Sequence, residues 1–373
     1  MIHPDQVKRV LQGVNPREVL DLTAGLVRIN SVWDPAAGTN EQEAAEMVAD
    51  WAEAQGFDYV MDQVAPGRPN VIITFQGRPG PRRLMFEAHT DVVTPGDPRA
   101  WRTDPFGAQI VGREMYGRGT NDTKGNLAAM LIALAALQRS GVELQGEIVA
   151  GVLCDEEDQM LGVQDFIQRG HADNITGAII CEPQDGLICC TQKGAIRARF
   201  TVTGRMSHGA MPLAGLNPAP ALARLIDGLA RLENKEIAAH GQDQLLGWPS
   251  LTPTVIKSPA AGPGQLNVMP GQAQVQVDVR TIPGQSHSQL KTDLEDLAEQ
   301  TAQEVNQAYA ESDRRLGLKR EADLQVGVDF LTDRPATLTD RSQPVVEAVH
   351  WATKMVFGTE PEYAGVLGAT DGT

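Results

Sequence analysis

The stretch LMFEAHTDVV, residues 84–93, decides the fold, because a run of apolar residues typical of a buried strand ends directly on a histidine. Two more stretches repeat this arrangement with acids: EIVAGVLCDEED at 147–158 and GAIICEP at 177–183. In open α/β sheets, ligands bind outside the carboxyl ends of the strands. We therefore expect the strand ends that carry His89, the acidic run 155–158 and Glu182 to meet at one crevice.

Along the whole chain, the expected pattern of secondary structure changes once, near Gly194. The first half alternates strand-like and helix-like segments, as α/β proteins do. From Gly194 the segments follow the order β-α-β-β-α-β, which is the ferredoxin-like arrangement. We therefore predict an α/β catalytic domain with a central mixed sheet, formed by residues 1–193 and 331–373, and an inserted ferredoxin-like α+β domain, residues 194–330.

The composition limits the class of protein. The 373 residues exceed what one hydrophobic core usually serves, which indicates two domains. A net charge of −16 argues against nucleic-acid binding, which needs a basic surface. No run approaches the ~18 apolar residues of a membrane helix, and the N-terminus lacks the apolar core of a signal peptide. We therefore expect a cytoplasmic protein with no nucleic-acid or membrane partner.

The predicted crevice has the chemistry of a metal site. Imidazole together with carboxylates suits Zn²⁺, Co²⁺ or Mn²⁺ better than Ca²⁺ or Mg²⁺. Clustered acids repel one another, and two divalent ions that share a bridging carboxylate, about 3.5–4 Å apart, remove this difficulty. Asp122 alone is explained as the N-cap of a predicted helix, and the acidic run alone as a solvated turn. Their coincidence with His89 and Glu182 at the junctions of elements favours the metal site.

At these residues the chain resembles a known family, the co-catalytic zinc peptidases and deacylases. That family includes acetylornithine deacetylase, succinyl-diaminopimelate desuccinylase, aminoacylase and glutamate carboxypeptidase. The resemblance spans nearly the whole chain and is carried by these segments: HTDVV at 89–93, WRTDPFGAQIVGREMYGRGTNDTKG at 101–125, DEED at 155–158, CEP at 181–183, GRMSHGAMP at 204–212, NVMP at 267–270, VDVR at 277–280 and GATDGT at 368–373. It implies a zinc-peptidase-like catalytic domain and an inserted domain that acts as a lid and a dimerisation surface.

The resemblance also implies a set of metal ligands. His89 and Glu182 would bind the first of two metal ions, Glu157 would bind the second, and Asp122 would bridge both. The peptide bond between Asp122 and Thr123 would be cis, as it is in the family. Zinc is the expected metal, with cobalt or manganese as alternatives.

The same resemblance assigns roles to five further residues. Glu156 would be the general base that takes a proton from the attacking water and passes it to the leaving amine. Asp91 would hydrogen-bond the far nitrogen of His89 and fix its tautomer. His208 would donate to the oxyanion of the tetrahedral intermediate, and Asn267 and Arg280 would bind the polar end of the substrate. Without the resemblance, Arg280 is explained as the partner of Asp278 in a salt bridge.

One expected ligand has no match in this sequence. The family places a last histidine, which binds the second metal, a few tens of residues after its Gly-x-(Ser/Thr)-Asp loop. Here that loop is residues 368–371, and the sequence stops at Thr373. We therefore expect the sequence to be truncated inside a family motif, and as it stands to bind the second metal weakly.

The expected activity is hydrolysis of the amide bond of a small N-acyl amino acid. Two alternatives stay open. One is a dipeptidase or carboxypeptidase of the same family, because the pockets for the leaving group are built from loops that the sequence does not describe. The other is a catalytically impaired binding protein on the same fold, which the missing histidine favours. Retention of Glu156 and His208 speaks against it, since a binding protein needs neither a base nor an oxyanion donor.

Overall fold

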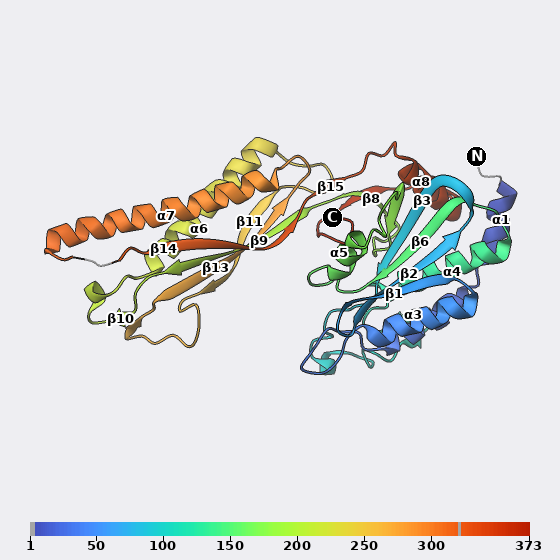
Figure 1. The fold of residues 1–373 in the computed structure, drawn as a ribbon, viewed down its shortest axis with the longest axis horizontal. Coiled ribbons are helices and arrows are strands. Elements are labelled where there is room, and N and C mark those ends of the chain that lie inside the picture. The colour runs from blue at the N-terminus through green and yellow to red at the C-terminus, as the bar shows by residue number, and fades with distance from the viewer. Residues whose placement is uncertain (1–3, 320–321) are drawn as a thin grey trace. The chain divides into compact units, whose positions relative to one another are not determined.

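The computed structural model describes residues 4–319 and 322–373, which form two compact units (Figure 1). The first unit comprises residues 1–187 and 342–361, and the second comprises residues 188–341 and 362–373. Three segments that the sequence analysis grouped with the catalytic domain, 188–193, 331–341 and 362–373, thus have most of their contacts in the second unit. The domain division at 193/194 and 330/331 remains a prediction.

A five-stranded sheet forms the centre of the first unit, with strands in the order β1-β2-β6-β3-β7. The strands are β1 (Asp58–Ala65), β2 (Arg68–Gln76), β3 (Arg78–His89), β6 (Gln145–Leu153) and β7 (Gly177–Ile180). β1, β2 and β6 pair antiparallel, whereas β6, β3 and β7 pair parallel, so the predicted mixed sheet is confirmed. The three parallel strands are the ones whose carboxyl ends carry the predicted ligands.

Helices cover both faces of this sheet, which explains why its strands are apolar at consecutive positions. Val71 and Ile73 of β2 pack in the main core, whereas Ile72 between them packs with Phe166 in a smaller core on the other face. The helices of the unit are α1 (Pro4–Gln12), α2 (Pro16–Arg28), α3 (Gln42–Gln55), α4 (Lys124–Ser140), α5 (Leu161–Gln168) and α8 (Pro344–Phe357). A short exposed hairpin, β4 (Gln109–Val111) and β5 (Glu114–Tyr116), precedes α4.

The start of α4 differs from the expectation for an N-cap. The cap residue is Thr123, whose side chain makes no capping hydrogen bond, and the carboxylate of Asp122 faces His89 instead. The end of α4 is ordinary, since Gly141 adopts a left-handed conformation with φ of 63°. Asp122 is therefore placed at the start of the helix without serving as its cap, which leaves its carboxylate available to a ligand.

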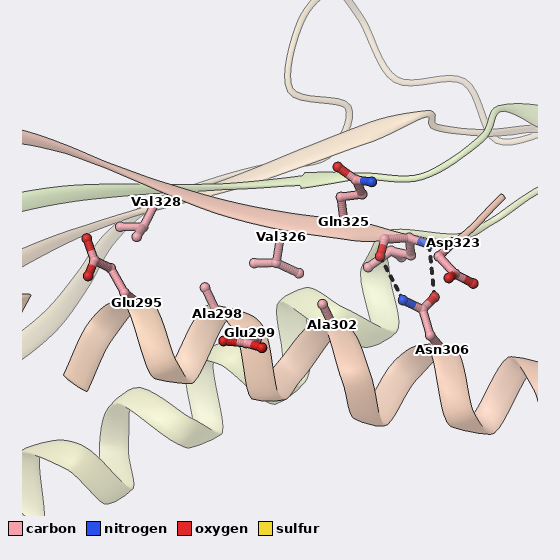
Figure 2. Close-up of a pocket in the computed structure, with 10 residues that line it drawn as sticks. Glu295, Ala298, Glu299, Ala302, Asn306, Asp323, Gln325, Val326 and Val328 are labelled. Atoms are coloured by element: carbon pink, nitrogen blue, oxygen red, sulfur yellow. Dashed lines mark hydrogen bonds between the residues drawn. The ribbon is translucent and has the colours of Figure 1, made fainter. Parts of the chain in front are cut away.

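The second unit has the ferredoxin-like arrangement that the sequence predicts. Its elements are β9 (Gly194–Thr203), α6 (Ala219–His240), β11 (Ser250–Lys257), β13 (Gln272–Thr281), α7 (His287–Leu316) and β14 (Gln325–Arg334). The strands pair antiparallel in the order β11-β13-β9-β14, and residues of α6 and α7 share one core with the sheet. Figure 2 shows how Asn306 of α7 fixes the start of β14, by two hydrogen bonds of 2.8 and 2.9 Å with the backbone of Leu324.

Smaller elements complete the second unit. A two-stranded ribbon joins β10 (Ser207–His208) to β12 (Val268–Met269), and a three-stranded sheet joins β8 (Ile188–Gln192), β15 (Thr337–Leu338) and β16 (Tyr363–Val366). Across residues 4–319 and 322–373, none of the helices has the length and apolar character required to cross a membrane.

Candidate metal centre

Three of the four predicted metal ligands lie together in the first unit. His89 ends β3, Asp122 precedes α4 and Glu182 follows β7, and one ligand atom of each lies within 4.8 Å of the others. Nε2 of His89 lies 3.2 Å from Oδ1 of Asp122 and 3.6 Å from Oε1 of Glu182. The side chains meet because β3 and β7 are parallel neighbours whose carboxyl ends share one edge of the sheet.

The acidic turn after β6 lies beside this group. The backbone N–H groups of Glu156 and Glu157 donate to the two carboxylate oxygens of Asp91, at 3.1 and 3.0 Å. Glu157 is outside the group of three ligands, but its side chain is near enough that desolvation and the Asp122 carboxylate together raise its pKa. Asp91 therefore fixes the turn that carries Glu156, the predicted base, and Glu157, the predicted fourth ligand.

The far nitrogen of His89 faces Asp91, the residue to which the resemblance assigned it. Nδ1 lies 3.0 Å from the backbone carbonyl oxygen of Asp91 and 3.4 Å from its carboxylate. Because a carbonyl oxygen only accepts, Nδ1 carries a proton, and whenever Nε2 is unprotonated its lone pair faces the centre of the site. Asp91 therefore sets the tautomer mainly through its backbone, while its carboxylate holds the turn at 156–157.

The loop before α4 is tied to the end of β7 by hydrogen bonds that the sequence analysis missed. The Asp122–Thr123 peptide bond is cis, as the resemblance implied. The Thr123 hydroxyl and the Asn126 amide both donate to the carbonyl oxygen of Cys181, at 2.7 and 2.8 Å. This carbonyl belongs to the residue before Glu182, so the two bonds fix the spacing between the Asp122 and Glu182 carboxylates.

The electrostatics of the group favour a bound cation. Burial raises the pKa of Glu182 to about 7, partly offset by the charge of His89 and increased by that of Asp122. Burial opposes protonation of His89, but its hydrogen bonds to Asp122 and Asp91 prevail and raise its pKa well above the ordinary value. Both shifts favour the protonated forms of Glu182 and His89 when no cation is bound, whereas a divalent ion would balance the charge of the carboxylates. One imidazole nitrogen and carboxylate oxygens fit zinc, cobalt or manganese.

The three remaining predicted residues belong to the second unit, and the structure brings two of them together. His208 lies in β10, and the backbone N–H of Gly209 donates to the carbonyl oxygen of Asn267 at 2.7 Å. Nδ1 of His208 accepts from the backbone N–H of Ala210 at 3.1 Å, so the proton of a neutral ring is on Nε2, which is then a donor.

Arg280 lies apart from this pair within the same unit. It is near the end of β13, about eight residues or ~26 Å along the strand from Gln272, the first residue of β13 after β12. Its Nε donates to Oδ2 of Asp278 at 2.9 Å, which is the salt bridge that explains this arginine without any substrate. A substrate carboxylate would compete with Asp278 for this guanidinium.

A buried lysine beside the cluster was not found from the sequence. Lys124 is fully buried, and its Nζ donates to the carbonyl oxygens of Leu26 and Ile29, at 2.9 and 2.8 Å. Burial lowers the pKa of this amine to about 7. The lysine thereby ties the end of α2 to the loop that carries Asp122. The sequence does offer one sign of this lysine: Lys124 is a single charge just before the apolar helical run LAAMLIALAAL, residues 127–137.

Replacing Lys124 with methionine should lower the free energy of unfolding by about 1–3 kcal/mol, because two carbonyl groups at the end of α2 lose their donor. Urea unfolding followed by circular dichroism measures the change. The matched control is Lys354→Met, which removes an exposed lysine paired with Glu360 and should leave the urea midpoint nearly unchanged. Equal midpoints for the two variants would contradict the structural role of Lys124.

Proteins of similar sequence belong to a family of peptidases, as the metal-binding residues described above would lead one to expect. Residues 85–373 match the family described as Peptidase family M20/M25/M40. A probable succinyl-diaminopimelate desuccinylase of Staphylococcus epidermidis is 24% identical over 376 residues, which are 96% of this chain and 86% of that protein. A succinyl-diaminopimelate desuccinylase of Stenotrophomonas maltophilia is 32% identical over 298 residues, 76% of this chain and 73% of that protein.

Solved structures of the family share the fold. A metallo-carboxypeptidase of Sulfolobus solfataricus has a TM-score of 0.73 at 19% identity, over 95% of this chain and 87% of that one. A Bacillus subtilis protein, described as a dinuclear metal-binding peptidase, has a TM-score of 0.62 at 16% identity, over 95% of this chain and 84% of that one. With the ligand cluster in place and most of the chain matched, the chain belongs to peptidase family M20/M25/M40 and is a metal-dependent hydrolase of amide or peptide bonds.

Proposed function

We propose that this chain hydrolyses the amide bond of a small N-acyl amino acid, as acetylornithine deacetylase and succinyl-diaminopimelate desuccinylase do. The observation that carries the proposal is the placement of the Glu156–Glu157 turn beside the His89–Asp122–Glu182 group. The curated relatives reported above support it, because both bear the name of a desuccinylase. The metal ligands proposed are His89 and Glu182 for one ion, Glu157 for a second, and Asp122 for both.

The proposed mechanism assigns one task to each side chain. His89, Asp122, Glu157 and Glu182 would hold two divalent ions, preferably zinc, which would polarise the scissile carbonyl and acidify the attacking water. Glu156 accepts the proton of that water on its carboxylate and delivers it to the nitrogen of the leaving amine. Asp91 keeps Glu156 in place through the backbone of the turn and keeps His89 in one tautomer. His208 is the proposed donor to the oxyanion, through Nε2.

Asn267 and Arg280 are the proposed contacts for the polar end of the substrate. A guanidinium binds a carboxylate through two parallel hydrogen bonds, which suits the carboxylate of an amino acid. Asp278 accepts from Nε of Arg280, so a substrate carboxylate that binds through Nε and one Nη competes with Asp278. Asp278→Asn weakens the competitor and should lower KM, whereas Arg280→Lys should raise it.

We also propose a cytoplasmic homodimer formed through the second unit. β14 is at the edge of the four-stranded sheet, and an open edge can pair with the same strand of another copy about a twofold axis. Light scattering coupled to size exclusion should give a mass of ~80 kDa, twice that of the 40.1 kDa chain. A mass near 40 kDa at all concentrations would contradict the dimer.

A panel of N-acetyl amino acids, N-succinyl amino acids and dipeptides, assayed with added zinc, tests the proposed activity. We expect one N-acyl class to be cleaved best, with release of a free amine that ninhydrin detects. The second candidate, a dipeptidase or carboxypeptidase, is favoured by the fold shared with the Sulfolobus carboxypeptidase, and preferential dipeptide cleavage would establish it instead. Zinc binding without turnover of any substrate would favour the catalytically impaired binding protein.

A further inference from the structure

A buried cluster of three charged side chains lies directly behind the metal centre. Arg68 begins β2, Glu41 precedes α3 and Asp155 follows β6, and their exposed fractions are 3%, 0% and 0%. The Arg68 guanidinium pairs with Glu41 through Nε, at 2.9 and 3.0 Å, and through Nη2 at 2.5 Å. The same Nη2 lies 2.6 Å from Oδ1 of Asp155. One arginine therefore joins two carboxylates that belong to different parts of the chain.

Burying these three charged side chains is costly in free energy. Taking charges out of water costs several kcal/mol per ion, and pairing offsets this only when the geometry is good. The cluster has two carboxylates and one guanidinium, and the face of Arg68 is covered by the Trp33 ring at 4.3 Å. Replacing a buried ion pair with apolar residues of similar volume is often neutral or stabilising, so the stability of the fold is a weak explanation for the arginine.

The charged cluster holds the turn that follows β6 in place. Asp155 has a left-handed backbone, with φ of 66°, and its carboxylate accepts from the backbone N–H groups of Gln159 and Leu161, at 3.3 and 3.1 Å. Its carbonyl oxygen accepts from the N–H of Met160 at 2.6 Å. The turn at 155–161 is thus folded around the side chain that Arg68 contacts.

Asn70, a second residue of β2, makes hydrogen bonds to both ends of the same turn. The Asn70 amide donates to the carbonyl oxygen of Gly162 at 2.8 Å, and its oxygen accepts from the N–H of Cys154 at 3.1 Å. The carboxylate of Asp91 also accepts from the N–H groups of residues 156 and 157. The turn is therefore held by Arg68 and Asn70 of β2 and by Asp91.

We propose that Arg68 is a positioning residue for the hydrolysis, which, by bridging Glu41 and Asp155, sets the place of the turn that carries Glu156 and Glu157. This rests on the proposed function, which makes Glu156 the base and Glu157 a metal ligand. Arg68 touches neither substrate nor metal and acts through Asp155. Loss of the bridge leaves Asp155 free to shift, and both acids of the turn move with it.

The test compares Arg68→Met and Arg68→Lys with Arg83→Met. Arg83 is a matched control because it bonds Glu147 at 2.7 Å and two backbone carbonyl groups, at the opposite end of the same sheet. We expect Arg68→Met to lower kcat by about 10–100-fold, with KM changed less than about threefold. Arg68→Lys should recover part of kcat, since an ammonium keeps the charge but not the fork of donors. Arg83→Met should lower the melting temperature and leave kcat near that of the parent.

A second readout does not depend on activity. Hydrogen–deuterium exchange of metal-free protein should show faster exchange in the peptide covering 154–162 for both Arg68 variants, and parent rates there for Arg83→Met. Arg68→Lys keeps the test valid if Arg68→Met does not fold, because it preserves the charge. Unchanged kcat in a folded Arg68 variant, or unchanged exchange in this peptide, would overturn the proposal. If Glu156→Gln stays active, the proposed function fails instead, and the exchange result still decides whether Arg68 holds the turn.

Discussion

Replacing Glu156 with glutamine should lower kcat by about 10²–10⁴-fold, which is the range that a general base contributes. Glutamine keeps the size of the side chain and its hydrogen-bonding oxygen but cannot take a proton from water. The backbone bond from residue 156 to Asp91 does not involve the side chain, so the turn stays in place. Metal content by mass spectrometry should match that of the parent, because Glu156 is not a proposed ligand.

Asp158→Asn is the matched control for this prediction. Asp158 lies in the same acidic run, two residues along, and its carboxylate bonds only the Gln159 amide among the hydrogen bonds described for it, at 3.3 Å. The change removes one negative charge from the same turn without touching the proposed base. We expect kcat close to that of the parent. If Asp158→Asn and Glu156→Gln lower kcat equally, the effect belongs to the charge of the turn and Glu156 is not the base.

Removing divalent cations with a chelator should abolish turnover and lower the melting temperature by several degrees. A ligand present at about 1,000 times its Kd stabilises the folded state by ~4 kcal/mol, and a metal ion bound by His89, Asp122 and Glu182 is such a ligand. Scanning calorimetry with and without added zinc measures the shift, and cobalt and manganese are tested in the same way. Activity that survives exhaustive chelation would contradict a metal-dependent mechanism.

A second histidine–carboxylate pair in the same unit supplies the control for this experiment. Nε2 of His171 lies 2.7 Å from Oδ2 of Asp62, outside the ligand cluster. His89→Asn should remove most of the zinc-dependent rise in melting temperature, whereas His171→Gln should preserve it. Equal losses in the two variants would mean that zinc stabilises the protein at a site other than the one described.

The parts of the fold that the sequence predicts are those with local signals. The runs before His89, Asp155 and Glu182 show where three strands end, and the parallel pairing of β6, β3 and β7 follows the general rule for such sheets. The β-α-β-β-α-β order of the second unit is likewise visible as alternating periodicity. These signals led us to expect His89 and Glu182 at one crevice, whereas the full set of four metal ligands came from the resemblance; His89, Asp122 and Glu182 lie together in the structure.

The partners behind the site could not be predicted, because they are distant in the chain. Lys124 bonds a carbonyl group 98 residues away, and Arg68 bonds Glu41 across 27 residues. A buried charge gives no local pattern that distinguishes it from a surface charge, and only the tertiary fold reveals its partner. The start of helix α2 does have a local signal in the sequence, because Asn15 is a favourable N-cap residue and Pro16 is favourable at the first helical position.

The position of α8 in the chain has a consequence for synthesis on the ribosome. This helix packs in the first unit near the start of β7, where Gly177 faces Val345, yet about 160 residues separate β7 from it. At about 5–20 residues per second, a ribosome makes the intervening segment in roughly 8–32 s. During that time the start of β7 around Gly177 lacks the cover that Val345 provides, and Val346, which is buried in the finished unit, has not yet been made. We expect this interval to be the stage at which the growing chain is most dependent on chaperones.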